Sequence, residues 1–115
     1  MKIPTIVSIF AACALLGAAP APAAESGDPV AGKGKTSMCA GCHGIPGYKT
    51  VFPDVYHVPK LGGQQAAYIV KALQEYKAGN RPHPTMRAIA AGLTDKDMAD
   101  LAAYYGSDVS KTAAK

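Results

Sequence analysis

The stretch Cys39-Ala40-Gly41-Cys42-His43 decides how this chain folds. Two cysteines three positions apart lie on one side of a helical turn, and the histidine follows directly. This C-x-x-C-H spacing is typical of the covalent attachment of a c-type haem. Both thiols can then add to the two vinyl groups at one porphyrin edge, and the His43 imidazole can bind the iron. The motif therefore predicts a chain that folds around a covalently bound macrocycle.

Three other interpretations of the cysteine pair compete with haem attachment. A structural disulfide between Cys39 and Cys42 is compatible with an exported protein. A thioredoxin-like redox pair needs a preceding strand within an α/β unit, and the sequence before Cys39 predicts none. A zinc site needs further ligands, and a second Cys/His pair is missing. Haem is attached outside the cytoplasm, so a signal for export favours the haem.

The beginning of the chain has the pattern of a secretory signal peptide. A basic start and an apolar stretch over residues 3–16 precede the small-residue exit Ala21-Pro22-Ala23. We expect residues 1–23 to be cleaved on export to the periplasm. An uncleaved anchor is the alternative, but roughly 14 apolar or small residues are short for a span. Acylation at Cys13, as in a lipoprotein, is disfavoured because apolar residues continue past it.

Composition limits the rest of the chain to one small unit. The 115 residues include 12 Lys+Arg, 8 Asp+Glu and no Trp, with a formal charge of +4. We expect a domain over residues 24–106 and a flexible polar tail over 107–115. No later apolar run approaches the roughly 20 residues of a membrane span. The modest charge without a Lys/Arg cluster predicts no binding of DNA or other nucleic acid. So small a domain with few aromatic residues needs something else to fill its interior.

The remaining pattern is helical. Asp28 and Pro29 predict a helix start, and glycines 32 and 34 inside that helix suggest a close crossing by another element. Prolines and glycines predict a long loop from Gly44 to Gly63. Thr94-Asp95-Lys96-Asp97 resembles a capping box at the start of a last helix. The predicted elements are helices over Pro29–Met38, Gln64–Ala78 and Asp95–Tyr105 and a helical turn over Met86–Ala91, so the fold is all-α.

A C-x-x-C-H motif supplies one axial ligand, and the sixth position decides what the iron can do. The candidates are Met38, His57, His83, Met86 and Met98. Met86 is favoured because the stiff segment His83-Pro84-Thr85-Met86 can aim a thioether. Met98 lies on the apolar stripe of the last helix, which predicts core packing. If Met86 were only a packing residue, a five-coordinate haem protein, peroxidase-like or gas-sensing, would remain, as would a thiol–disulfide protein without haem.

Met38 and the two histidines are weaker candidates. Met38 is next to Cys39 and cannot reach the opposite face of the ring. His57 and His83 are expected at the surface or near the haem propionates.

From Gly27 to Gly106 the chain resembles a class I c-type cytochrome of the small soluble bacterial monohaem kind. The resemblance implies an all-α fold of three to four short helices around one covalent haem c with its iron. It implies a non-enzymatic, monomeric one-electron carrier that docks transiently with redox partner proteins. The matching pieces are Gly27-Asp28 through Lys33, Cys39 to Gly44, Pro59 to Gln64, Tyr68 to Gly79, Pro84-Thr85-Met86 and Leu93 to Tyr105.

The resemblance also implies roles for residues outside the motif. The carbonyl of Pro59 would accept the Nδ1–H of His43, and Leu61 would pack on the ring. Gly32 would cross against Tyr104 or Tyr105. The loop 45–58 is longer than in the minimal members of the family, so what covers the lower edge of the haem stays open.

Overall fold

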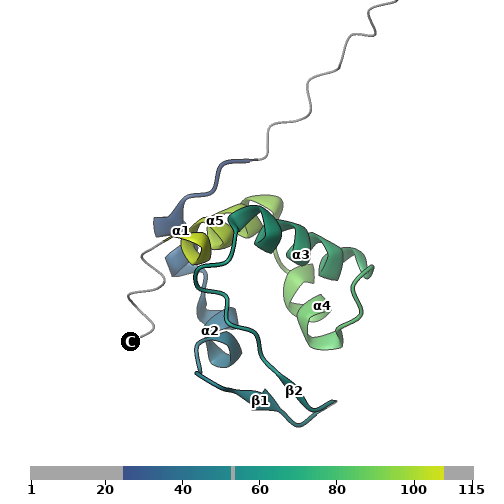
Figure 1. Cartoon of the computed structure of the whole chain (residues 1–115). Coiled ribbons are helices and arrows are strands. Elements are labelled where there is room, and N and C mark those ends of the chain that lie inside the picture. Colours follow the sequence, from purple (N-terminus) through teal and green to yellow (C-terminus); the bar gives the residue numbers. More distant parts are fainter. Residues whose placement is uncertain (1–24, 53, 108–115) are drawn as a thin grey trace, which may run out of the picture.

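The computed structural model describes residues 25–52 and 54–107, and this part of the chain is mostly helical (Figure 1). The predicted leader, 1–23, and the predicted tail beyond Ser107 lie outside the described residues. The predicted all-α class is confirmed. The elements in chain order are α1 (Pro29–Gly34), α2 (Ser37–His43), β1 (Lys49–Thr50), β2 (Tyr56–His57), α3 (Ala66–Ala78), α4 (Pro84–Ala91) and α5 (Asp95–Gly106).

The prediction of one helix over Pro29–Met38 was wrong, because the structure has two. The chain leaves α1 at Lys35, whose N–H turns to the carbonyl of Gly32 at 3.0 Å. Gly32 and Gly34 each weaken the first helix by about 1 kcal/mol relative to alanine. A second helix then begins at Ser37, so the C-x-x-C-H motif lies on a short helix of its own, α2.

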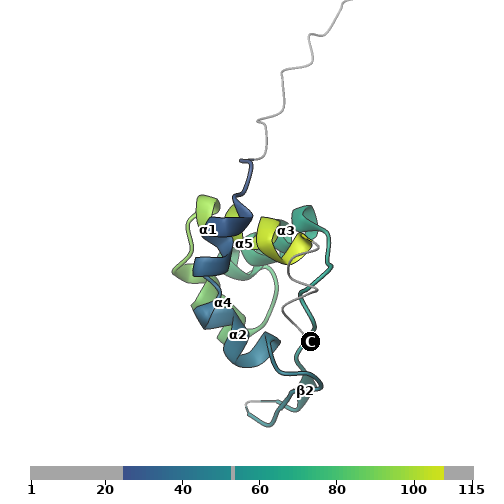
Figure 2. The same cartoon turned by 90° about the vertical axis from the view of Figure 1, so that its left-hand side faces the viewer.

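Helix α1 crosses α5 closely, and Gly32 makes that crossing feasible (Figure 2). A Cβ atom at Gly32 would lie 2.0 Å from the carbonyl oxygen of Asp100 and 2.9 Å from the Cβ of Tyr104. Only glycine fits such a distance without moving the main chain. The expected contact between Gly32 and Tyr104 is therefore confirmed.

A buried carboxylate fastens the same crossing. Asp100 is 1% exposed, and its Oδ1 accepts the backbone N–H of Asp28 at 2.7 Å and the Nζ of Lys96 at 2.6 Å. Its Oδ2 accepts the Nζ of Lys35 at 2.7 Å. The Asp28 N–H and the two ammonium groups hold the pKa of Asp100 well below its ordinary value. The segment before α1, the end of α1 and the first turns of α5 are thus joined at one side chain.

The last three helices begin and end near the predicted residues. Helix α3 ends at Ala78 and is capped by Gly79, whose φ of +83° is left-handed, as is common at helix C-termini. Helix α4 begins at Pro84, two residues before the predicted turn. The capping box at α5 is confirmed: the Thr94 side chain accepts the N–H of Asp97, and the Asp97 carboxylate accepts the N–H of Thr94.

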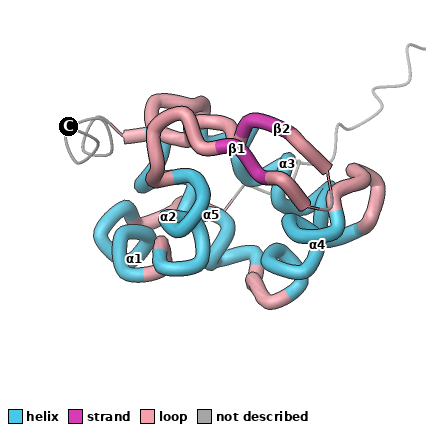
Figure 3. Tube along the Cα trace, turned by 90° about the horizontal axis from the view of Figure 1, so that it is seen from below, coloured by secondary structure: helices cyan, strands magenta, loops and turns pink. Residues whose placement is uncertain are grey.

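The predicted loop between Gly44 and Gly63 contains a short antiparallel hairpin. Lys49 pairs with His57 and Thr50 with Tyr56. Two-residue strands are too short to give an alternating sequence pattern, so the prediction missed them. Seen from below, the hairpin runs along one edge of the molecule (Figure 3). In this view α1 and α2 lie toward the left and α3 and α4 toward the right.

The close-packed core is small and lies mainly on α5. The buried apolar residues are Ile69, Ala90, Met98, Ala99, Leu101, Ala102 and Tyr104. Met98 is fully buried, which confirms the prediction that it packs in the core. Among the described residues, none of the helices is both long enough and apolar enough to cross a membrane. The small core leaves apolar side chains elsewhere that face a cavity instead of one another.

Candidate cofactor site

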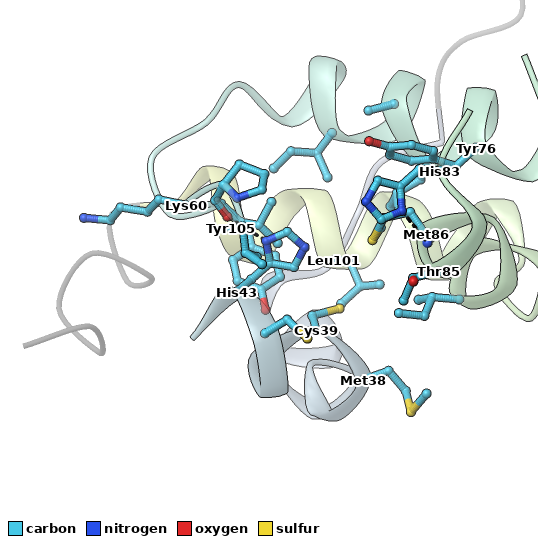
Figure 4. A pocket seen from close by; sticks show the side chains of 18 of the residues that line it. Met38, Cys39, His43, Lys60, Tyr76, His83, Thr85, Met86, Leu101 and Tyr105 are labelled. Carbon is cyan, nitrogen blue, oxygen red and sulfur yellow. Dashed lines mark hydrogen bonds between the residues drawn. The ribbon is translucent and has the colours of Figure 1, made fainter. Parts of the chain in front are cut away.

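A cavity of about 560 Å³ lies between the helices and the hairpin (Figure 4). This volume falls within the range of about 300–1,000 Å³ that small-molecule and cofactor sites span. Its walls come from α2, the hairpin, the segment before α3, and α3, α4 and α5. Apolar walls include Val58, Ile69, Leu73, Ile89, Leu93 and Leu101. The chain thus surrounds a large apolar space, and the apolar side chains that line it face this space instead of packing against one another.

Helix α2 brings the whole motif to one wall of this cavity. Cys39, Cys42 and His43 all line it, and each is half-buried. The two thiols are not joined in a disulfide in this structure. Burial raises the pKa of the Cys39 thiol, and a hydrogen bond with Tyr105 opposes that change. Because no disulfide joins them, both sulfur atoms can form bonds to a partner in the cavity.

A hydrogen bond to the main chain orients the His43 ring. Its Nδ1 lies 2.6 Å from the carbonyl oxygen of Pro59. A carbonyl oxygen only accepts hydrogen bonds, so Nδ1 carries the proton and Nε2 keeps its lone pair. The contact that the resemblance implies for Pro59 is present. Leu61 follows two residues later, half-buried, and also lines the cavity.

Met86 lines the cavity from a different element, the first turn of α4. Figure 4 shows Met86 and His43 coming from separate helices with the cavity between them. Within the described residues, no three His, Cys, Asp or Glu side chains gather to share a metal ion.

Of the other candidates for the sixth ligand, Met38 and His83 also line the cavity, whereas Met98 and His57 do not. Met98 is buried outside the cavity lining, and His57 is exposed and also outside it. Met38 is 68% exposed beside Cys39 on α2. His83, expected at the surface or near the propionates, is half-buried, and its Nδ1 accepts the N–H of Met86 at 3.2 Å.

Several polar aromatic residues of the cavity wall were not predicted as site residues. The tyrosines that line it are Tyr48, Tyr56, Tyr68, Tyr76 and Tyr105. Burial raises the pKa of the Tyr105 hydroxyl. Tyrosines fill apolar space and keep one polar atom for a hydrogen bond, which suits a wall between a macrocycle and solvent. The tyrosines of α3 fall eight positions apart, and that spacing could have placed both on one face.

Arg81 joins this wall just after α3. Its guanidinium lies 4.7 Å from the centroid of the Tyr76 ring and donates to the hydroxyl of Tyr68 at 3.3 Å. The Tyr68 hydrogen bond raises the pKa of Arg81. The sequence does not predict this charge at the cavity, because Arg81 lies in the turn after α3 while the two tyrosines that it contacts lie on that helix.

The chemistry of these residues fits an iron porphyrin. Two thiols three positions apart match two vinyl groups, the free Nε2 of His43 is an iron donor, and Met86 offers a thioether. The walls are mainly apolar. The donor set and the cavity together fit a covalently attached haem.

Comparisons with known proteins agree with this fit. The family model described as "Cytochrome c" matches residues 31–107. Cytochrome c4 of Pseudomonas aeruginosa is 35% identical over 102 residues, which cover 89% of this chain and 47% of that protein. Cytochrome c-554(548) of Halomonas halodenitrificans is 39% identical over 85 residues, covering 71% of this chain and 98% of that protein.

A solved structure matches the fold. The crystal structure of reduced recombinant cytochrome c4 from Pseudomonas stutzeri has a TM-score of 0.52 and 33% identity. The match covers 70% of this chain and 50% of that one. This chain spans about half the length of the cytochromes c4 that it matches. The motif on α2, the helical fold around an apolar cavity and the family match lead to one conclusion: the chain belongs to the cytochrome c family, as a class I c-type cytochrome.

Proposed function

We propose that this chain is a one-electron carrier with a single haem, attached at Cys39 and Cys42 and ligated by His43 and Met86. The observation that supports the proposal is that His43 and Met86 line one apolar cavity from two different helices. When bound, the haem supplies an iron that passes between ferric and ferrous states. The side chains around it set how firmly that iron is held and how easily it is reduced.

On the α2 side, His43 is the proximal ligand. The hydrogen bond from its Nδ1 to the Pro59 carbonyl fixes the ring orientation and strengthens Nε2 as a donor. Leu61, which lines the cavity two residues after Pro59, would pack against the macrocycle. These two residues let the imidazole keep one position in both oxidation states, and little rearrangement favours fast electron transfer.

On the α4 side, the Met86 thioether is the sixth ligand. With both His43 and Met86 bound to it, the iron would have no open position for a substrate or a gas, so these residues suit electron transfer better than catalysis. Methionine ligation also raises the reduction potential. The apolar walls act in the same direction, because they disfavour the extra charge of the oxidised state.

Export and docking complete the proposal. Cleavage of residues 1–23 delivers the chain to the periplasm, where the haem is attached. Ala40, Gly41 and Gly63 are each exposed, and each is next in sequence to a residue that lines the cavity. A redox partner protein docks there transiently with a monomer of this chain, as expected for small and weak redox contacts. The intact mass of the exported protein reports the cleavage site and the attached tetrapyrrole together.

Matched methionine variants test the ligand set. Met86→Leu removes the thioether at the cavity, and Met98→Leu makes the same change in the core at similar volume. We expect the wild type to have low-spin bands and a sulfur–iron charge-transfer band, and not to bind carbon monoxide when reduced at neutral pH. Met86→Leu should lose the charge-transfer band, bind carbon monoxide and have a lower potential. Met98→Leu should keep the wild-type spectrum.

Three outcomes would overturn the proposal. High-spin bands in the wild type would indicate a five-coordinate haem protein, peroxidase-like or gas-sensing. Loss of the charge-transfer band in Met98→Leu, with the band kept in Met86→Leu, would move the ligand to α5. A colourless exported protein would leave a thiol–disulfide protein.

A further inference from the structure

His83 occupies the N-cap of α4, three residues before Met86. Its backbone is extended, with φ −166° and ψ 99°, and Pro84 takes the first helical position. The ring nitrogen Nδ1 accepts the N–H of Met86 at 3.2 Å. An N-cap side chain normally satisfies one of the free N–H groups of a helix start, and here that group belongs to the residue that offers its thioether to the cavity. Because Nδ1 accepts, the ring proton lies on Nε2.

The ring of His83 makes edge-to-face contacts with two tyrosines from other elements. Tyr56, on β2, lies edge-on to it with centroids 4.9 Å apart and planes at 84°. Tyr76, on α3, does the same at 5.9 Å and 78°. Edge-to-face packing is a preferred arrangement of aromatic rings. His83 therefore links the hairpin and α3 to the first turn of α4, and Figure 4 shows its ring beside Tyr76 and Met86.

We infer that His83 is a positioning residue for the methionine ligand. The tyrosines fix the imidazole, the imidazole fixes the main chain of Met86 through Nδ1, and the thioether is thereby aimed at the cavity. This inference rests on the proposed function, in which Met86 binds the iron. His83 also lines the cavity, but its proposed role is to hold the main chain of Met86 through Nδ1 and not that of an iron ligand. Histidine is not among the preferred N-cap residues, so capping alone does not account for it here. Its contacts with Tyr56 and Tyr76 add what a Ser or Asp cap would lack, a ring that other elements hold in place.

The test measures how readily an outside ligand replaces Met86. Imidazole added to the ferric holoprotein must displace the thioether, so its apparent affinity reports how firmly Met86 is held. His83→Ala removes the cap and the contacts with both tyrosine rings. His83→Asn keeps a good acceptor for the cap but also loses the contacts with the tyrosine rings. His57→Ala is the matched control, because His57 is exposed and outside the cavity lining. Met86→Leu gives the imidazole affinity expected when no thioether has to be displaced.

We expect His83→Ala to raise the apparent imidazole affinity about fivefold and to weaken the charge-transfer band. Fivefold corresponds to about 1 kcal/mol, at tenfold per 1.4 kcal/mol. His83→Asn should raise the affinity by about twofold, and His57→Ala should leave affinity and band unchanged. Should His83→Ala not accumulate as folded holoprotein, His83→Gln replaces it, since glutamine keeps bulk but is not a preferred N-cap residue. Its affinity should rise by at least about twofold.

The inference fails if His83→Ala lowers the free energy of unfolding but leaves imidazole affinity and the charge-transfer band as in the wild type. His83 would then be an ordinary helix cap. It also fails if His57→Ala has an equal effect. The two proposals can be separated: if Met86→Leu keeps the band and the wild-type imidazole affinity, the ligand assignment itself is wrong, and the role of His83 falls with it.

Discussion

Replacing Gly32 by alanine should break the crossing of α1 over α5. The new Cβ would lie 2.0 Å from the Asp100 carbonyl oxygen and 2.6 Å from its carbonyl carbon. Both are main-chain atoms and cannot rotate away. Ordinary contact for a Cβ begins at 3.4 Å. The two helices must therefore separate by more than 1 Å, which also stretches the hydrogen bond between Asp28 and Asp100.

Overpacking of this kind costs about 3 kcal/mol at the upper end of its usual range. Alanine returns up to about 1 kcal/mol, because it loses less backbone entropy than glycine in a helix. The net loss for Gly32→Ala is about 2 kcal/mol of unfolding free energy, equivalent to a fall in Tm of about 8–16 °C for a domain of this size. Urea and thermal unfolding of the holoprotein, followed by helical circular dichroism, measure both quantities.

Gly34→Ala is the matched control on the same helix. A Cβ at Gly34 meets no heavy atom within 4 Å. Only the helix-propensity gain remains, so this variant should be as stable as the wild type or up to about 1 kcal/mol more stable. If the two variants unfold within about 0.5 kcal/mol of each other, the close crossing at Gly32 does not limit what this helix pair tolerates. The reasoning about α1 and α5 would then be refuted.

Two further variants test the carboxylate and a helix end. The fold lowers the pKa of Asp100, so its contribution to stability is present above the unfolded pKa of about 3.9 and is lost as the pH falls through the lower folded value. Asp100→Asn should therefore be less stable than the wild type at pH 7 and lose less stability between pH 5 and pH 3 in urea titrations; equal pH slopes would contradict this. Gly79→Ala, at φ +83°, should lose about 1 kcal/mol in thermal unfolding, whereas Gly92→Ala, at φ −82° with its nearest contact at 3.7 Å, should change little. Equal losses would show that the left-handed backbone is not the cause.

Local spacing in the sequence determined the centre of the site. Cys39, Cys42 and His43 are recognisable without any structure, because three neighbouring residues share one helical turn wherever the rest of the chain goes. Pro59 was predicted only through resemblance to a family, since nothing local links it to His43. Met86 was favoured by the prolines before it, and it lines the cavity together with His43, as the candidates Met38 and His83 also do. Its ligation of the iron stays a prediction.

Long-range packing decided what local spacing could not. The sequence did not predict the break between α1 and α2, where Lys35 leaves the helix and its Nζ binds Asp100 on α5. Two-residue strands leave no periodic pattern to read. The sequence predicted His83 at the surface or near the propionates; in the structure it is half-buried, contacts tyrosines from β2 and α3 and accepts the N–H of Met86 at Nδ1. A residue's partners within one turn follow from covalent geometry, whereas partners from other elements exist only once the chain has closed around its apolar cavity.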